Sequence, residues 1–125
     1  MSSKLLWEPM GVYWKYYGKV SGKEIIDAST SIYGDPRFDN LKYKLVDFLD
    51  IEAIDMDEYE VAQIAYQHKA AEISNQNIKN AIVVRSDSRE LADKFCSFFD
   101  DSNWKVRVFQ DMDEANVWLG RVPSF

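Results

Sequence analysis

Apolar and polar residues near the start of the chain alternate with the two-residue period of a β-strand. Residues 5–7 form a short apolar run, and residues 8–11 follow it with proline second and glycine fourth, which suits a type I turn. Beyond the turn, alternate positions point to opposite faces: Val12, Trp14 and Tyr16 to one, and Tyr13, Lys15 and Tyr17 to the other. The pattern predicts a β-hairpin over residues 5–17 that ends at Gly18.

Helical spacing of apolar residues recurs four times, each time after a helix-start signal. Ser21 with Glu24 has the spacing of a capping box, which predicts a helix from Gly22 that stops at Gly34 and Pro36. In the other three signals an aspartate caps the helix and a glutamate follows three residues later: Asp55 with Glu58, Asp87 with Glu90, and Asp111 with Glu114. The longest helix is predicted over residues 56–73, and the last ends before Gly120.

Three further strands separate these helices. Residues 43–49 are rich in β-forming residues and are predicted as a mostly buried strand. Residues 81–84 are apolar without interruption, which is typical of a parallel strand covered on both faces. Apolar and charged positions alternate over residues 104–108, so this strand is expected nearer an edge of the sheet.

The order of elements is therefore ββαβαβαβα. It predicts an α/β fold with a mixed β-sheet, in which an N-terminal antiparallel hairpin is followed by β-α units whose helices pack on the sheet. A chain of 125 residues buries about two thirds of its surface on folding. Because no repeat, linker or shift in composition divides the sequence, residues 1–125 are expected to form a single domain.

Composition and charge narrow the class of partner. A net charge of -6, from 15 basic and 21 acidic residues, has the wrong sign for a nucleic-acid-binding surface. The single cysteine, Cys96, excludes a disulfide within one chain and fits a reducing compartment. The N-terminal apolar run is too short for a signal peptide, and no stretch approaches 18 apolar residues, so neither secretion nor a membrane span is expected. We therefore predict a cytoplasmic protein.

No set of residues encodes a recognisable reaction. His68 is the only histidine and has no second ligand or orienting partner at a readable spacing, so a boundary or surface position is predicted for it. Cys96 follows Phe95 and is predicted to be a small core residue. Glycine-rich phosphate loops and Gly-x-Ser-x-Gly elbows are missing. We expect no enzymatic activity, no cofactor and no metal.

Seven acidic residues crowd the middle of the chain: Asp47, Asp50, Glu52, Asp55, Asp57, Glu58 and Glu60. Several carboxylates together suit a hard cation such as Ca²⁺ or Mg²⁺. The last members of the cluster also stand at a predicted helix N-terminus, where negative charge is favoured by capping and by the helix dipole. We favour the capping interpretation over a metal site.

Aromatic residues gather in the hairpin at Tyr13, Trp14, Tyr16 and Tyr17. Because successive strand residues face opposite sides, Tyr13 and Tyr17 cannot share a face with Trp14 and Tyr16. One of these faces must lie away from the main core or under another element. The four residues are candidates for a partner or ligand surface, and cross-strand packing is the alternative reason for their presence.

Three local motifs stand out along the chain: Val-Asp-Phe-Leu-Asp at residues 46–50, Asp-Met-Asp-Glu at residues 55–58, and Val-Arg-Val-Phe-Gln-Asp at residues 106–111 followed by Glu-Ala and Trp-Leu. Together with the order of elements, these motifs resemble the SpoIIAA-like subgroup of the STAS superfamily. The resemblance spans nearly the whole chain. It implies a SpoIIAA-like fold.

In STAS domains of the anti-anti-sigma type, a serine in an Asp-Ser-Ser-Gly segment at a helix start is phosphorylated to switch a protein contact. The resemblance places that segment on Asp55, Met56, Asp57 and Glu58. Asp55 matches, but Asp57 holds the phosphoacceptor position and Glu58 replaces the glycine. The usual phosphoserine switch is therefore not expected. The related SEC14-like domains hold small apolar or anionic ligands.

Two functions follow as expectations. The first is a non-enzymatic regulatory or protein-interaction module that binds another protein or a second copy of itself, through residues 55–58 and the hairpin aromatics. The alternative is a carrier for a small apolar or anionic ligand, with a pocket between the sheet and the helix predicted over residues 56–73.

Overall fold

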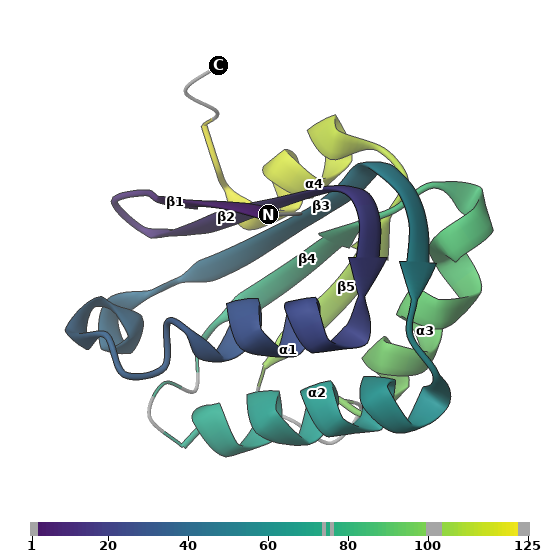
Figure 1. Cartoon of the computed structure of the whole chain (residues 1–125). Helices are drawn as coiled ribbons and strands as arrows, with labels where there is room; N and C mark the ends of the chain where they lie inside the picture. The colour runs from purple at the N-terminus through teal and green to yellow at the C-terminus, as the bar shows by residue number, and fades with distance from the viewer. Residues whose placement is uncertain (1–2, 74, 76, 100–103, 123–125) are drawn as a thin grey trace.

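The computed structural model describes residues 3–73, 75, 77–99 and 104–122. Five strands form one sheet in the order β1-β2-β3-β4-β5. They are β1 (Ser3–Trp7), β2 (Gly11–Ser21), β3 (Tyr43–Asp55), β4 (Lys79–Val83) and β5 (Lys105–Phe109). β1 pairs with β2 antiparallel, and all other neighbours are parallel (Figure 1). The mixed sheet and the order ββαβαβαβα are confirmed.

Four helices cover the two faces of this sheet unequally. They are α1 (Gly22–Thr30), α2 (Glu58–Ala71), α3 (Arg89–Ser97) and α4 (Met112–Leu119), and two short 3₁₀ helices, η1 (Pro36–Asn40) and η2 (Ser86–Ser88), lie in the connections. α1, α2 and α3 lie on one side of the sheet and α4 on the other (Figure 1). No helix among the described residues is long and apolar enough to cross a membrane.

Side chains on the two faces form two separate hydrophobic cores. The larger core lies under α1, α2 and α3, and the smaller one lies under α4. In β4, Ile82 enters the larger core, whereas Ala81 and Val83 enter the smaller one. β4 is therefore covered on both faces, and β5 lies at the edge of the sheet, as their sequence patterns predict.

β2 and β3 are longer than predicted. The two strands pair with each other as far as Ser21 and Asp55, with register shifts at Lys15/Tyr17 and Gly18/Lys19. Gly18 has a positive φ of 69°, a conformation that glycine adopts at little cost and that lets the strand continue through an irregular point. The predicted ends at residues 18 and 49 were wrong, because pairing persists where the simple alternation is interrupted.

The start of α1 agrees with its capping signal, but its end does not. The Ser21 side chain caps the helix by accepting the Glu24 N–H at 3.2 Å. The helix ends at Thr30 rather than at Gly34. Thr30 and Ser31 hydroxyls donate to main-chain carbonyls of the preceding turn, and such local hydrogen bonds compete with continuation of a helix.

The start of α2 corrects the predicted cap. Asp57, not Asp55, caps the helix: its Oδ1 accepts the Glu60 N–H at 2.8 Å, and the Glu60 side chain accepts the Asp57 N–H at 3.2 Å. Asp55 with Glu58 and Asp57 with Glu60 have the same spacing. Asp55 is held in β3 by pairing with Ser21, which leaves the second pair to form the capping box.

Of the other two predicted aspartate caps, one forms and one does not. Asp111 caps α4 by accepting the Asp113 N–H at 2.8 Å, and Gly120 ends the helix with a positive φ of 70°, both as predicted. Asp87 does not cap α3. It lies within η2, where its carboxylate is 3.4 Å from Arg85, and α3 begins two residues later at Arg89.

Candidate functional site

A largely apolar cavity of about 80 Å³ lies in the larger core, between the sheet and the helices α1, α2 and α3. Its walls are mostly aliphatic and aromatic side chains from β2, β3, β4 and the three helices. The lining residues Ile54, Met56, Ser88 and Leu91 are half-buried, so the side of the cavity between the end of β3 and the start of α3 is nearest to solvent.

The strand register places two polar residues side by side in this apolar wall. Lys44 of β3 is paired with Asn80 of β4, and both side chains line the cavity. In β3, Val46 lies two residues beyond Lys44 on the same face, and Ile82 stands in the same relation to Asn80. The lysine and the asparagine therefore occupy positions that the two-residue period assigns to the core.

Lys44 is the most unusual group of the site. Its side chain is fully buried, and its Nζ has no hydrogen-bond partner among the described residues. Three aromatic rings surround the Nζ, with centroids 5.1 Å (Trp104), 5.5 Å (Tyr33) and 5.9 Å (Trp14) away. These ring faces attract a cation, but burial dominates and lowers the pKa of Lys44 to about 7.

His68 lies beside this lysine and corrects a prediction. It is buried, with 6% of its surface exposed, rather than at a boundary or on the surface. Its Nδ1 donates to the Ile64 carbonyl at 2.9 Å, an interaction within α2. Burial and the neighbouring Lys44 hold the pKa of His68 well below its ordinary value, so the ring is neutral. Ile64 and Ala65 lie four and three residues before His68, on the same face of the helix, so the sequence already indicated that this face is buried.

Other polar groups close to Lys44 also lack partners within the described chain. The Asn80 Nδ2 and the Tyr33 hydroxyl are both buried and have no hydrogen-bond partner there. Buried polar groups in proteins are nearly always hydrogen-bonded. Of these groups, Lys44 and Asn80 line the cavity, and an ammonium and an amide N–H are both donors, so this part of the cavity suits a group that accepts hydrogen bonds.

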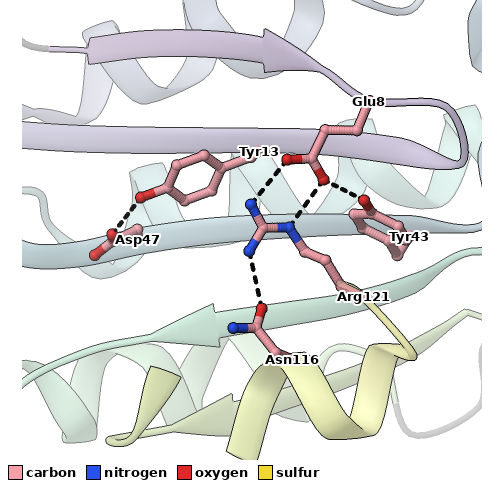
Figure 2. Close-up of polar contacts among 6 residues, drawn as sticks. All are labelled: Glu8, Tyr13, Tyr43, Asp47, Asn116 and Arg121. Atoms are coloured by element: carbon pink, nitrogen blue, oxygen red, sulfur yellow. Dashed lines mark hydrogen bonds and ion pairs between the residues drawn. The ribbon is translucent and has the colours of Figure 1, made fainter. Parts of the chain in front are cut away.

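A second polar cluster lies on the opposite face of the sheet and joins the turn after β1 to the segment after α4 (Figure 2). Arg121 donates to both oxygens of Glu8 at 2.8 Å, and to Asn116 at 2.9 Å. Tyr43 donates to the same Glu8 carboxylate. The bond from Arg121 lowers the pKa of Glu8, and burial raises the pKa of Tyr43 to about 12. This cluster is internally satisfied, which indicates a structural role.

The hairpin aromatics do not form one surface. Trp14 and Tyr16 are buried in the larger core and line the cavity, whereas Tyr13 and Tyr17 lie on the other face, as alternation predicts. Tyr13 is half-buried and donates to Asp47 at 2.6 Å (Figure 2), and Tyr17 is 42% exposed. A ligand role stays a prediction for Trp14 and Tyr16, and Tyr17 alone of the four is open to a partner.

The segment that resembles a phosphorylation loop borders the cavity. Asp55 is exposed at the end of β3, and Met56 is half-buried and lines the cavity. Asp57 and Glu58 are exposed at the start of α2, and Glu58 forms an ion pair with Lys94 of α3. No three His, Cys, Asp or Glu side chains within the described ranges are grouped to hold a metal ion. The Asp57 cap supports the capping interpretation of the acidic cluster.

Cys96 is half-buried in α3 and packs against the larger core. It was predicted as a small core residue, and it lies at the edge of the core rather than inside it. Lys44 and Asn80 are the residues that the sequence analysis missed. The signal was their register with Val46 and Ile82, which marks both as inward-facing.

Comparison with known proteins identifies the fold of this chain. No family model matches the sequence, and no curated protein matches it. Among solved structures, the crystal structure of an uncharacterised protein of the DUF3478 family with a SpoIIAA-like fold, from Shewanella loihica PV-4, superposes with a TM-score of 0.55. The match is 13% identical in sequence and covers 94% of this chain and 91% of that one. The chain therefore has a SpoIIAA-like fold, the fold that the resemblance of its motifs implied.

Proposed function

We propose that this protein is a non-enzymatic binding module that holds a small, mainly apolar ligand in the cavity between the sheet and α1, α2 and α3. The observation that supports the proposal is Lys44, a buried amine in an apolar wall without a partner in the described chain. Burying a polar group without a hydrogen bond costs about 1–3 kcal/mol. A ligand that uses the group explains why the fold retains it.

The size of the cavity limits what it holds. One water-sized group needs roughly 10–15 Å³ of cavity volume. A cavity of about 80 Å³ therefore accommodates on the order of five to eight non-hydrogen atoms. This is the size of a six-carbon chain or a substituted benzene, or of one end of a longer molecule. The half-buried Ile54 and Met56 mark the side on which such a molecule enters.

A cavity-filling substitution tests this proposal. Ala92 of α3 is buried and lines the cavity, so Ala92→Leu places three more carbon atoms in the space. Calorimetric titration of the wild-type chain with hexanoate and with 1-hexanol is expected to show saturable one-to-one binding of at least one probe. The Ala92→Leu variant is expected to bind it at least ten times more weakly.

The matched control is Ala70→Leu, the same change at an exposed position of α2. It should bind the probe as the wild type does. Absence of binding of both probes to the wild type contradicts the proposed function. Equal affinity of the wild type and Ala92→Leu for the probe places the binding elsewhere and contradicts it as well.

A second candidate function is contact with another protein, or with a second copy, through residues 55–58. The observation in its favour is position: exposed Asp55 and Glu58 flank Met56, which lines the cavity, so cavity and surface meet there. Asp57 is needed for the helix cap, so the informative variant is Asp55→Lys with Glu58→Lys. Loss of a complex seen by native mass spectrometry supports this contact, and an unchanged complex removes the segment from it.

A further inference from the structure

Within the part of the chain that the structure describes, the residues lining the cavity include one cationic side chain and no carboxylate counter-ion. Among its lining residues Lys44 is the only lysine or arginine, and none is an aspartate or a glutamate. His68 also lines it, but its Nδ1 is committed to the Ile64 carbonyl and its ring is neutral. A lone ammonium in an apolar, buried setting attracts an anion far more strongly than it would in water.

The neighbours of Lys44 supply hydrogen bonds to the same point. Asn80 is its direct partner in the adjacent strand, and the Asn80 Nδ2 is buried and unpartnered within the described residues. Neighbouring strands lie about 4.8 Å apart and both residues line the cavity, so the amide and the ammonium belong to the same wall. A carboxylate has two acceptor oxygens, one for each of these donors.

The balance of charge favours a carboxylate over a phosphate monoester. A phosphate monoester carries a charge of about -1.5 to -2 at neutral pH and three acceptor oxygens. The lining residues offer it a single positive charge. A carboxylate carries one negative charge, which one Lys44 ammonium neutralises.

We propose that the ligand of this cavity is a small monocarboxylate, whose apolar part fills the space beside Phe48 and Ile82 and whose carboxylate is bound by the Lys44 ammonium and the Asn80 amide. This inference rests on the proposed function and names its ligand class. The aromatic rings of Trp14, Tyr33 and Trp104 stand around the ammonium and keep it in place.

Three probes of equal length test the head group on the full wild-type chain: hexanoate, 1-hexanol and hexylamine. At pH 6.5 hexanoate is expected to bind at least ten times more tightly than hexanol, and hexylamine more weakly than either. Equal affinities of hexanoate and hexanol overturn the monocarboxylate and leave the proposed function standing. If none of the three binds, the proposed function falls with it.

Two variants locate the anion. Lys44→Met keeps the length of the side chain and removes its charge, so it should bind hexanoate at least ten times more weakly while hexanol binding is kept. Lys15→Met is the control, because Lys15 lies on the opposite face of the sheet with Asp47 and Asp50. Full hexanoate affinity in Lys44→Met overturns the inference. The head-group comparison on the wild type remains decisive if that variant does not fold.

The pH dependence of binding gives an independent readout. The titratable groups that line the cavity or face Lys44 are His68 from α2, Tyr16 from β2 and Tyr33 after α1. Burial lowers the pKa of His68 and raises the pKa of both tyrosines, so none of them changes charge between pH 6.5 and 9. Burial lowers the pKa of Lys44 to about 7, so Lys44 loses its positive charge over this range. The affinity for hexanoate is therefore expected to fall at least tenfold, while the affinity for hexanol stays constant. A constant hexanoate affinity contradicts the ion pair.

Discussion

At position 44 a lysine stands where the alternation of β3 points the side chain into the larger core. Its Nζ has aromatic faces around it but no acceptor in the described residues. A buried amine without an acceptor among these residues lowers the stability of the fold. Its cost can be measured directly as a dependence of stability on pH.

Lys44 should make the ligand-free protein more stable as the pH rises from 7 to 9.5. Its pKa is about 7 in the folded chain and near 10.5 when unfolded, so over this range the unfolded state binds the additional proton and stability increases with pH. The expected gain in the free energy of unfolding is roughly 2–3 kcal/mol. Urea unfolding at several pH values measures it.

The variant Lys44→Met should lose this pH dependence. It should also be more stable than the wild type by about 1–3 kcal/mol at pH 7, because it removes a buried amine that has no partner within the described ranges. The pH range avoids the titration of His68, whose pKa is lowered, and of Tyr16 and Tyr33, whose pKa values are raised. A wild type whose stability is flat from pH 7 to 9.5 would show that Lys44 is not buried as described.

Residue-scale features were only partly predictable from the sequence. The sequence predicts that Tyr13 and Trp14 point to opposite faces of the sheet, because successive side chains of a strand always do. Lys44 shares the inward register of Val46 and Phe48, so its burial was open to prediction as well. The lack of a partner for its Nζ among the described residues was not predictable, because it depends on side chains from α1, α2 and β4 that the sequence does not bring together.

At the scale of elements, the junction of β3 and α2 decides how the cavity rim is built. β3 runs to Asp55, two residues then cross to the helix, and Asp57 begins the capping box with Glu60. The connection is short, so Met56 is held against the cavity and not in a free loop. The Asp57 and Glu60 carboxylates stabilise this junction through the two hydrogen bonds of the capping box.

Removing the Asp57 side chain should destabilise the protein. Asp57→Ala leaves the Glu60 N–H without its acceptor, and loss of such a cap costs about 1 kcal/mol of unfolding free energy. The paired control is Asp55→Ala, which leaves the capping box intact and should cost little. Chemical denaturation of both variants measures the difference. A larger loss in Asp55→Ala than in Asp57→Ala would restore the cap that the sequence suggested.

Element types were more predictable than element ends. Periodicity identified the five strands and the four helices, because burial of one face imposes it. Two aspartate–glutamate pairs with identical spacing compete at the start of α2, and only the pairing of β3 with β2 selects between them. The same dependence on tertiary pairing explains why β3 continues beyond residue 49.

At the scale of the whole molecule, the two faces of the sheet differ in what they contain. The face under α1, α2 and α3 contains the cavity. The other face carries α4 and the cluster of Glu8, Tyr43, Asn116 and Arg121, which joins the turn after β1 to the segment after α4 (Figure 2).

Breaking this cluster should destabilise the whole chain. Arg121 and Glu8 side chains are only 8% and 13% exposed, so Arg121→Leu leaves a nearly buried carboxylate without its cation, at a cost of about 3 kcal/mol. Arg89→Leu is the control, since its partner Asp93 is exposed and such pairs contribute less than about 1 kcal/mol. Thermal unfolding of both variants tests this. Equal losses would contradict the structural role of the cluster.

The Glu8–Arg121 pair lies beyond sequence-based prediction. Its members are separated by 113 positions, and neither stands in a motif. The order of elements predicts that the hairpin and the C-terminal helix belong to one sheet assembly. It does not predict which charged residues meet across it.

Native mass spectrometry of the protein, gently isolated from its own cells, tests the central claim most directly. The wild type should carry a reproducible small added mass that solvent extraction releases as a carboxylic acid. Ala92→Leu, isolated in the same way, should lack it, and Ala70→Leu should keep it. Bare chains in every preparation, or the same added mass on the Ala92→Leu variant, would contradict a ligand held in this cavity.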